Sequence, residues 1–204
     1  GAYNEDGTLK SNAVVVYVTE ANKNSVTATI GGASYTGISN ILSVDALKTA
    51  TAPICVRMIG NITDLGSGKA FDKGDLLIQN NNNAIGLTIE GIGEDAVCNG
   101  FGIRIKTSSN VEIRNLGSMN CDSSEGDSIG LQQDNDHIWV HNCDVFYGDA
   151  GSDADQDKGD GALDTKKSQY VTHSYNHFWD CGKVHLNGNG DTTLNYITYH
   201  HNWY

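Results

Sequence analysis

Four carboxylates in the second half of the chain form two closely spaced pairs. Glu125 and Asp127 flank a glycine, and Asp160 and Asp164 enclose the tripeptide Gly-Ala-Leu. Ca²⁺ is a hard cation that takes six to eight oxygen ligands in proteins, often from carboxylates. If neighbouring strands bring the two pairs together, these side chains can form a calcium site. The alternative is that each pair lies in a solvated acidic loop.

Lysines follow the second pair of carboxylates. Lys166 and Lys167 come just after Asp164, and Lys183 lies in the segment Cys-Gly-Lys-Val-His-Leu. A bound cation can bridge two negative surfaces, and lysines beside it can contact an anionic substrate. The pattern therefore predicts calcium-dependent chemistry on an acidic polymer. For Lys166 the alternative is a structural role, in which its charge relieves repulsion between the carboxylates.

Three more aspartates alternate in the longest insertion of the chain. Asp153, Asp155 and Asp157 have the spacing of an EF-hand loop, with Asp164 at the twelfth position. The sixth position, which requires glycine, is Lys158, and no helical pattern flanks the segment. We expect a solvated loop here, and a weak accessory calcium site is the alternative.

A strand-like segment recurs five times and must position these groups. The first copy ends in Gly91 and the other four end in an asparagine. Successive end residues are 24, 27, 34 and 26 residues apart. The copies are residues 87–91, 111–115, 138–142, 171–176 and 197–202. Repeats of this length are typical of solenoids and propellers, and four-stranded propeller blades are longer. The repeat therefore predicts an all-β fold, a parallel β-helix with one coil per repeat.

The asparagines that end the last four copies are predicted to stack at one turn. These are Asn115, Asn142, Asn176 and Asn202. Asparagine tolerates left-handed backbone at a sharp bend, and stacked amides can hydrogen-bond from coil to coil. The alternative is that asparagine simply populates turns.

Histidines recur with the same spacing. His141, His173, His200 and His201 could form a transition-metal site or supply a base. Because their spacing follows the repeat, we expect them to stack within the solenoid instead.

The first 50 residues are less regular. Val14–Thr19 is predicted to be a strand, and Ile38–Lys48 has helical spacing. A short helix there could cap the N-terminal end of the solenoid, whose open edge would otherwise invite aggregation. Without a linker or a composition break, we expect one domain over residues 1–204. Because the chain ends on a strand at Tyr204, we expect that domain to be incomplete at its C-terminal end.

Composition excludes several classes of protein. The net charge of −12 argues against a general nucleic-acid binder, because phosphate contact requires a basic surface. No apolar stretch approaches the roughly 18 residues of a membrane helix. Five cysteines are an odd number, and their pairing stays open. Gly1, without an initiator methionine or a signal peptide, suggests a processed start.

Several segments together resemble polysaccharide lyase family 1, the pectate lyases. The resemblance runs from about Val14 to Tyr204 in the family's order. The segments are Gly100–Lys106, Asn110–Leu116, Glu125–Ile129, Asp160–Asp164, Tyr175–Phe178 and Ile197–Tyr204. The resemblance implies a right-handed parallel β-helix, secreted and monomeric. It also implies cleavage of de-esterified polygalacturonate by β-elimination, with Ca²⁺ between enzyme and substrate.

By the same resemblance, the primary Ca²⁺ ligands are Glu125, Asp127, Asp160 and Asp164. Lys183 matches the family's catalytic lysine, which binds the substrate and orients its ring, and Lys166 matches a second substrate-binding lysine. The chain departs from the family after Trp139-Val140, where His141-Asn142 stands in place of an Asp-His pair.

The arginine that acts as base in this family follows the His-His-Asn-Trp-Tyr segment, beyond Tyr204. We therefore expect the 204-residue chain alone to be inactive and the intact enzyme to have an alkaline optimum, because arginine has a high pKa.

Two other functions remain open. A polygalacturonase-like glycoside hydrolase would use carboxylates as acid and base without a metal. A β-helical adhesin or carbohydrate-binding module would not catalyse any reaction. A pectin lyase is disfavoured, because methyl-esterified substrate does not require four calcium-binding carboxylates.

Overall fold

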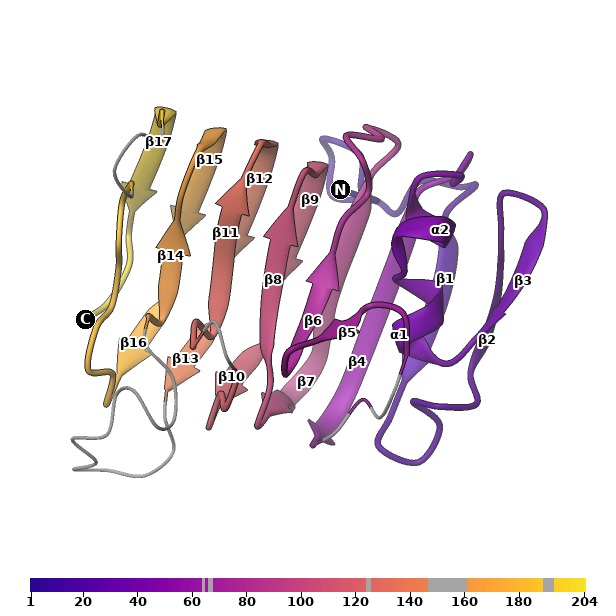
Figure 1. The fold of residues 1–204 in the computed structure, drawn as a ribbon, viewed down its shortest axis with the longest axis horizontal. Coiled ribbons are helices and arrows are strands. Elements are labelled where there is room, and N and C mark those ends of the chain that lie inside the picture. The colour runs from indigo at the N-terminus through magenta and orange to yellow at the C-terminus, as the bar shows by residue number, and fades with distance from the viewer. Residues whose placement is uncertain (64, 66–67, 124–125, 147–160, 189–192) are drawn as a thin grey trace.

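The protein is a parallel β-helix, as predicted. The computed structural model describes residues 1–63, 65, 68–123, 126–146, 161–188 and 193–204. Within these residues, strands from successive coils pair in parallel along one axis (Figure 1). Only β2 with β3 and β5 with β6 pair antiparallel among the described strands.

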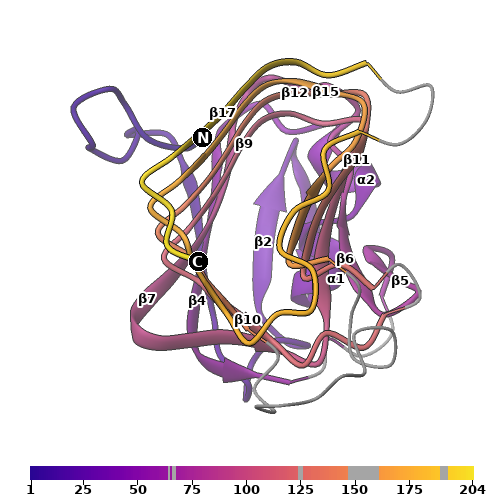
Figure 2. The same ribbon diagram turned by 90° about the vertical axis from the view of Figure 1, so that its left-hand side faces the viewer.

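Three walls enclose the interior (Figure 2). The first wall contains β5 (Phe71–Asp72), β6 (Asp75–Ile78), β8 (Gly102–Lys106), β11 (Ile129–Gln133) and β14 (Leu163–Thr165). The second wall contains β1 (Val14–Val18), β9 (Ser109–Arg114), β12 (Asn135–His141), β15 (Ser168–Ser174) and β17 (Asn195–His200). The third wall contains β10 (Gly117–Met119), β13 (Asp144–Phe146) and β16 (His177–Trp179).

Two longer strands pass from the second wall into the third. These are β4 (Ile54–Ile62) and β7 (Leu87–Asn99). The start of β7 pairs with β9, and its end, from Val97, pairs with β10. Each regular coil therefore contributes one segment to every wall.

The register confirms the predicted repeat. Val111 pairs with Leu87 and with Ile138, Ile138 pairs with Val171, and Val171 pairs with Ile197. These apolar side chains point inward at a period of two residues, as strands with one buried face require. The spacing in the sequence thus located one wall of the fold.

The N-terminal end of the stack carries two short helices where one was predicted. They are α1 (Ile38–Ile41) and α2 (Val44–Leu47), next to the hairpin of β2 (Thr27–Ile30) and β3 (Ala33–Thr36) (Figure 1). Ser43 separates them, because its backbone is extended and its side chain accepts a hydrogen bond from the N–H of Ala46. Serine in that position is a common N-cap, so it begins the second helix. Both helices bury apolar side chains in the core.

The asparagine ladder differs from the prediction. Asn115 and Asn142 occupy the left-handed position at the end of their strands, but Tyr175 and His201 occupy it in the next two coils. Asn176 and Asn202 lie one residue later. There Asn176 donates to the side-chain oxygen of Asn202 at 3.1 Å. The predicted stack of four asparagines is therefore divided in two. Asn115 and Asn142 lie at the bend, and Asn176 and Asn202 lie one residue beyond it, because the last two coils place an aromatic residue at the bend.

The histidines do not form one stack, contrary to the prediction. His173 points into the core, where its Nε2 lies 2.9 Å from the hydroxyl of Thr165. His141 stacks on Trp139, and His201 stacks on Tyr175. The reason is that Ser174 separates His141 from His200 at their shared position of the repeat, while His173 and His201 occupy the positions before and after it.

All five cysteines lie within the described residues, and none of them forms a disulfide. Burial raises the pKa of the Cys143 thiol to about 12, so it stays protonated and unreactive. In the part of the chain that the structure describes, no helix is long and apolar enough to cross a membrane.

Burial of His173 predicts a loss of stability in acid. Burial lowers the pKa of His173 to about 3, whereas an unfolded histidine titrates near 6.5. The contribution of His173 to the free energy of unfolding is complete above pH 6.5 and falls as the pH drops toward 3, because only the unfolded chain takes up the proton. The free energy of unfolding should fall by about 2 kcal/mol from pH 6.5 to pH 5. Urea unfolding at the two pH values measures this change.

The variant His173→Gln is the control for this prediction. Glutamine can still hydrogen-bond to Thr165 but does not titrate. The free energy of unfolding should therefore depend less steeply on pH, by the amount that corresponds to about one proton taken up on unfolding. His185, 6.3 Å away between ring centroids, also has a lowered pKa through burial and keeps its own share of the slope. An unchanged slope in His173→Gln would contradict the assignment.

Candidate calcium and substrate site

The outer face of the first wall positions the predicted site. Alternate residues of β8, β11 and β14 point into the core, and the residues between them point out. Parallel pairing then places Arg104, Gly130 and Asp164 in one outward row, one from each coil. Glycine in the middle of the row leaves room for a side chain from a neighbouring segment.

Two of the predicted calcium ligands meet over Gly161. Asp127 Oδ1 accepts a hydrogen bond from the N–H of Gly161 at 3.3 Å. A Cβ atom at Gly161 would overlap with the carboxylate of Asp164, and one at Gly130 would lie 2.9 Å from Oδ2 of Asp127. The two glycines thus admit two carboxylates that are 37 residues apart in sequence.

Both carboxylates are buried, and a lysine lies between them. Asp127 and Asp164 are each 4% exposed. Lys166 Nζ lies 3.6 Å from Asp127 Oδ2 and 3.9 Å from Asp164 Oδ2. Burying two like charges is unfavourable unless an opposite charge compensates them. The ammonium group therefore relieves their repulsion, which is the structural role considered for Lys166.

Lys183 lies one coil further along the same wall. Its backbone pairs with Gly161, and its carbonyl accepts a hydrogen bond from the N–H of Ala162 at 2.9 Å. The residue is exposed. The structure therefore brings Asp127, Asp164 and Lys166 together and places Lys183 in the next coil of the same wall.

The other two predicted ligands, Glu125 and Asp160, lie outside the described residues, and so do Asp153, Asp155 and Asp157. Gly126 and Gly161, their direct neighbours, are described. Among the described residues, no three His, Cys, Asp or Glu side chains form a group that could hold a metal ion.

The donor chemistry fits a hard cation. Asp127 and Asp164 supply negatively charged oxygens on neighbouring coils, and Ca²⁺ prefers such ligands. One oxygen of Asp164 also accepts the N–H of Leu186 at 3.0 Å, which holds the carboxylate in position.

Sequence reasoning missed three residues of this face. Gly130 and Gly161 make room for the carboxylates, and the only signal for them was their place within the two acidic segments. Arg104, next to Gly130, forms ion pairs with Asp72 and with the buried Asp75. No spacing rule connects Arg104 with Asp72 and Asp75, because they meet through the pairing of β5 with β6 and of β6 with β8.

Comparisons with known proteins agree with this architecture. Residues 8–204 match a family model described as pectate lyase. The chain is 31% identical over 178 residues to the pectate trisaccharide-lyase of Bacillus licheniformis, covering 85% of this chain and 50% of that protein. It is 41% identical over 113 residues to pectate lyase A of Aspergillus niger, covering 53% and 33%. The chain thus spans half the length or less of these curated relatives.

Solved structures show the same fold. The pectate lyase Bsp165PelA of Bacillus sp. N165, in complex with trigalacturonate, has a TM-score of 0.70 at 23% identity, covering 97% of this chain and 58% of that chain. Pectate lyase C of Erwinia chrysanthemi, at pH 9.5 with 30 mM Ca²⁺, has a TM-score of 0.67 at 24% identity, covering 95% and 56%.

Proposed function

Because the chain belongs to the pectate lyase family, we propose that the intact protein cleaves pectate by β-elimination at the outer face of the first wall. The observation that carries this proposal is the convergence of Asp127 and Asp164 on Gly161, with Lys166 and Lys183 on the same wall. Buried carboxylates next to lysines suit an anionic substrate that is bridged by a cation.

The calcium ligands in this proposal are Asp127 and Asp164, together with Glu125 and Asp160 from outside the described residues. When bound, Ca²⁺ would act as a Lewis acid on the uronate carboxylate. Gly161 and Leu186 orient the two described carboxylates through backbone N–H groups, so less reorganisation is needed when a cation binds.

The lysines would hold the polymer. Lys183 would pair with a uronate carboxylate and orient its ring, which places the C5–H bond for attack. Removal of the C5 proton sends its electron pair into a new C4–C5 double bond, and the C4–O bond breaks with its electrons on the leaving oxygen. Lys166 would supply a second contact to substrate in addition to its ion pairs with Asp127 and Asp164. The base is not assigned to any residue of this chain.

The polymer substrate also indicates where the protein acts. Pectate is a plant cell-wall polymer too large to enter a cell, so we place the intact protein outside the cell that makes it. We expect it to act as a monomer.

An elimination assay tests this function. The intact protein, incubated with polygalacturonate and Ca²⁺, should generate the ultraviolet absorbance of an unsaturated uronate. EDTA should abolish the signal, and added Ca²⁺ should restore it, because the site depends on a divalent cation. New reducing ends without absorbance, unaffected by EDTA, would indicate a hydrolase. Binding without either signal would indicate a module that only binds carbohydrate.

A further inference from the structure

A cleft on the outer face of the second wall lies apart from the proposed calcium site. Its volume is about 520 Å³, and its walls include Tyr3 and Glu5 of the N-terminal segment and Arg114, Trp139 and Tyr170 of the coils. Viewed down the axis, β12 and β11 lie in different walls of the solenoid (Figure 2). We propose that this cleft and its surroundings bind an uncharged sugar chain. The inference is independent of calcium binding and of the proposed cleavage reaction.

Exposed aromatic rings border the cleft. Trp139 is 44% exposed and Tyr170 is 45% exposed. Tyr170 stacks between His137 and Tyr196, with centroid distances of 4.8 Å and 4.7 Å. We call His137, Trp139, Tyr170 and Tyr196 the aromatic surface. It runs across three coils of the second wall, parallel to the axis of the solenoid.

The backbone under this row does not favour tyrosine, which occupies two of its three positions. His137, Tyr170 and Tyr196 have φ values of 55°, 52° and 57°, in the left-handed region. At the same position, the two preceding coils carry Gly86 and Asn110, the residue types that this backbone prefers.

Stacking between coils does not by itself favour aromatic residues here over the asparagine of an earlier coil. A strained backbone of this kind costs, for each residue, at least as much free energy as one stacked aromatic pair contributes. Stacking between coils therefore roughly offsets the strain at most. Strained residues persist at sites where their side chains have a function, and exposed rings in a row suit a ligand with flat apolar faces.

Polar side chains lie directly beside the aromatic row. Asp136, Gln169 and Asn195 precede the three stacked residues and are in register with one another. Gln169 Nε2 donates to Asp136 Oδ2 at 2.7 Å, and all three line an adjoining cleft of about 430 Å³. Amides and carboxylates can donate to and accept from hydroxyl groups, and aromatic rings can pack against the C–H faces of a sugar. Binding sites combine these two kinds of surface.

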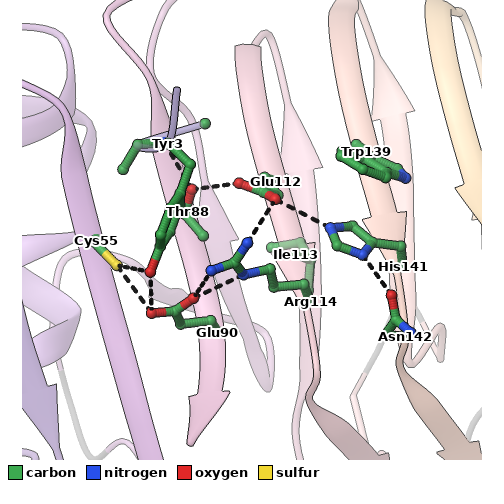
Figure 3. Close-up of polar contacts among 12 residues, drawn as sticks. Tyr3, Cys55, Thr88, Glu90, Glu112, Ile113, Arg114, Trp139, His141 and Asn142 are labelled. Atoms are coloured by element: carbon green, nitrogen blue, oxygen red, sulfur yellow. Dashed lines mark hydrogen bonds and ion pairs between the residues drawn. The ribbon is translucent and has the colours of Figure 1, made fainter. Parts of the chain in front are cut away.

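A charge network lies at the base of the larger cleft (Figure 3). Glu112 is buried, with His141 Nε2 at 3.1 Å and Arg114 Nη1 at 3.5 Å. Burial opposes ionisation of Glu112, but hydrogen bonds from His141 and Thr88 keep its pKa below the ordinary value. The sequence has no aspartate directly before His141, where the family has an Asp-His pair. Glu112, from the preceding coil, places a carboxylate next to His141 instead. Arg114 also pairs with Glu90 at 2.6 Å, so its charge is already balanced.

The charges around the two clefts disfavour an acidic polymer. Among the described side chains that line them, four are carboxylates, and only Arg114 and Lys167 are permanently cationic. Both cations are paired, Lys167 with Asp134 at 3.0 Å. The carboxylates are Glu5, Glu112, Asp134 and Asp136. A polyuronate would meet uncompensated negative charge here, whereas an uncharged sugar would not. The clefts therefore select a neutral glycan.

Affinity electrophoresis of the intact protein tests the proposal. The probes are galactan, arabinan, xyloglucan and soluble cellulose derivatives, with polygalacturonate in EDTA as the acidic comparison. At least one neutral polymer should retard the protein. Trp139→Ala should weaken that retardation by about tenfold, because a stacked aromatic contact contributes about 1.4 kcal/mol. Its elimination activity on polygalacturonate should equal that of the unmodified protein.

Two further variants complete the experiment. Trp179→Ala removes a similarly exposed tryptophan from the third wall and should leave binding unchanged. Tyr170→Asn installs the residue that an earlier coil uses at this backbone position, so it should fold and still lose affinity. Lack of retardation by all four neutral polymers would overturn the proposal, as would stronger retardation by polygalacturonate that depends on Trp139. Neutral-glycan binding by a protein without elimination activity would refute only the proposed function.

Discussion

Replacing Asp164 with asparagine should reduce both calcium affinity and pectate cleavage by the intact protein by roughly 100-fold or more, the loss expected when a buried charged partner is removed. Asparagine keeps the size of the side chain and an oxygen that can accept the N–H of Leu186. It removes one of the negative charges that hold the cation. Calorimetric titration with Ca²⁺ and the absorbance of the unsaturated product measure the two effects.

Two variants separate loss of charge from loss of structure. Gly161→Ala keeps every carboxylate, but its Cβ would overlap with that of Asp164, so calcium affinity should fall although net charge is unchanged. Asp95→Asn removes an exposed carboxylate on β7, outside the first wall, and should have no effect. Full calcium affinity and turnover in Asp164→Asn would show that Asp164 is not a ligand.

Replacing Lys183 with alanine should reduce kcat/KM on polygalacturonate by about 100-fold, in the range found when one preorganised electrostatic contact is removed. Calcium affinity should change little, because Lys183 is exposed and lies in the coil after Asp164. Steady-state kinetics over a range of polymer concentrations, together with calcium titration, measure the two quantities.

Three other lysine variants sharpen this test. Lys183→Arg keeps the charge and should recover part of the activity, although the geometry of the contact changes. Lys69→Ala removes a lysine that pairs with Asp45, near the N-terminal end, and should be neutral. Lys166→Ala should alter calcium affinity as well as kinetics, because Lys166 contacts both buried carboxylates. If Lys183→Ala behaves like Lys69→Ala, Lys183 does not contact the substrate.

The sequence alone was sufficient for the architecture of the coils. In a solenoid each coil packs mainly on its neighbours, so a periodic pattern of apolar residues translates directly into register. Val111, Ile138, Val171 and Ile197 were aligned by spacing, and they pair in that order. The acidic segments and lysines were predicted to lie together; Lys166 contacts Asp127 and Asp164, and Lys183 lies in the next coil of the same wall.

Local backbone conformation was less accessible from the sequence. An asparagine at the end of a strand predicts a left-handed bend, but Asn176 and Asn202 lie one residue beyond it. Similarly, the helical spacing of Ile38–Lys48 did not show that Ser43 divides the segment. In both cases a single residue decides between neighbouring conformations whose free energies differ little, and contacts with adjacent coils determine the outcome.

Only the tertiary structure decided which side chains meet between coils. Periodicity places a residue on a wall but does not say how closely two side chains approach, because that distance depends on what lies between them. Gly130 and Gly161 admit the carboxylates of Asp127 and Asp164, and Glu112 reaches His141 from the neighbouring strand. The sequence by itself thus determined the coil, one wall and the family. The three-dimensional packing of residues more than 20 positions apart determined the geometry of both candidate sites.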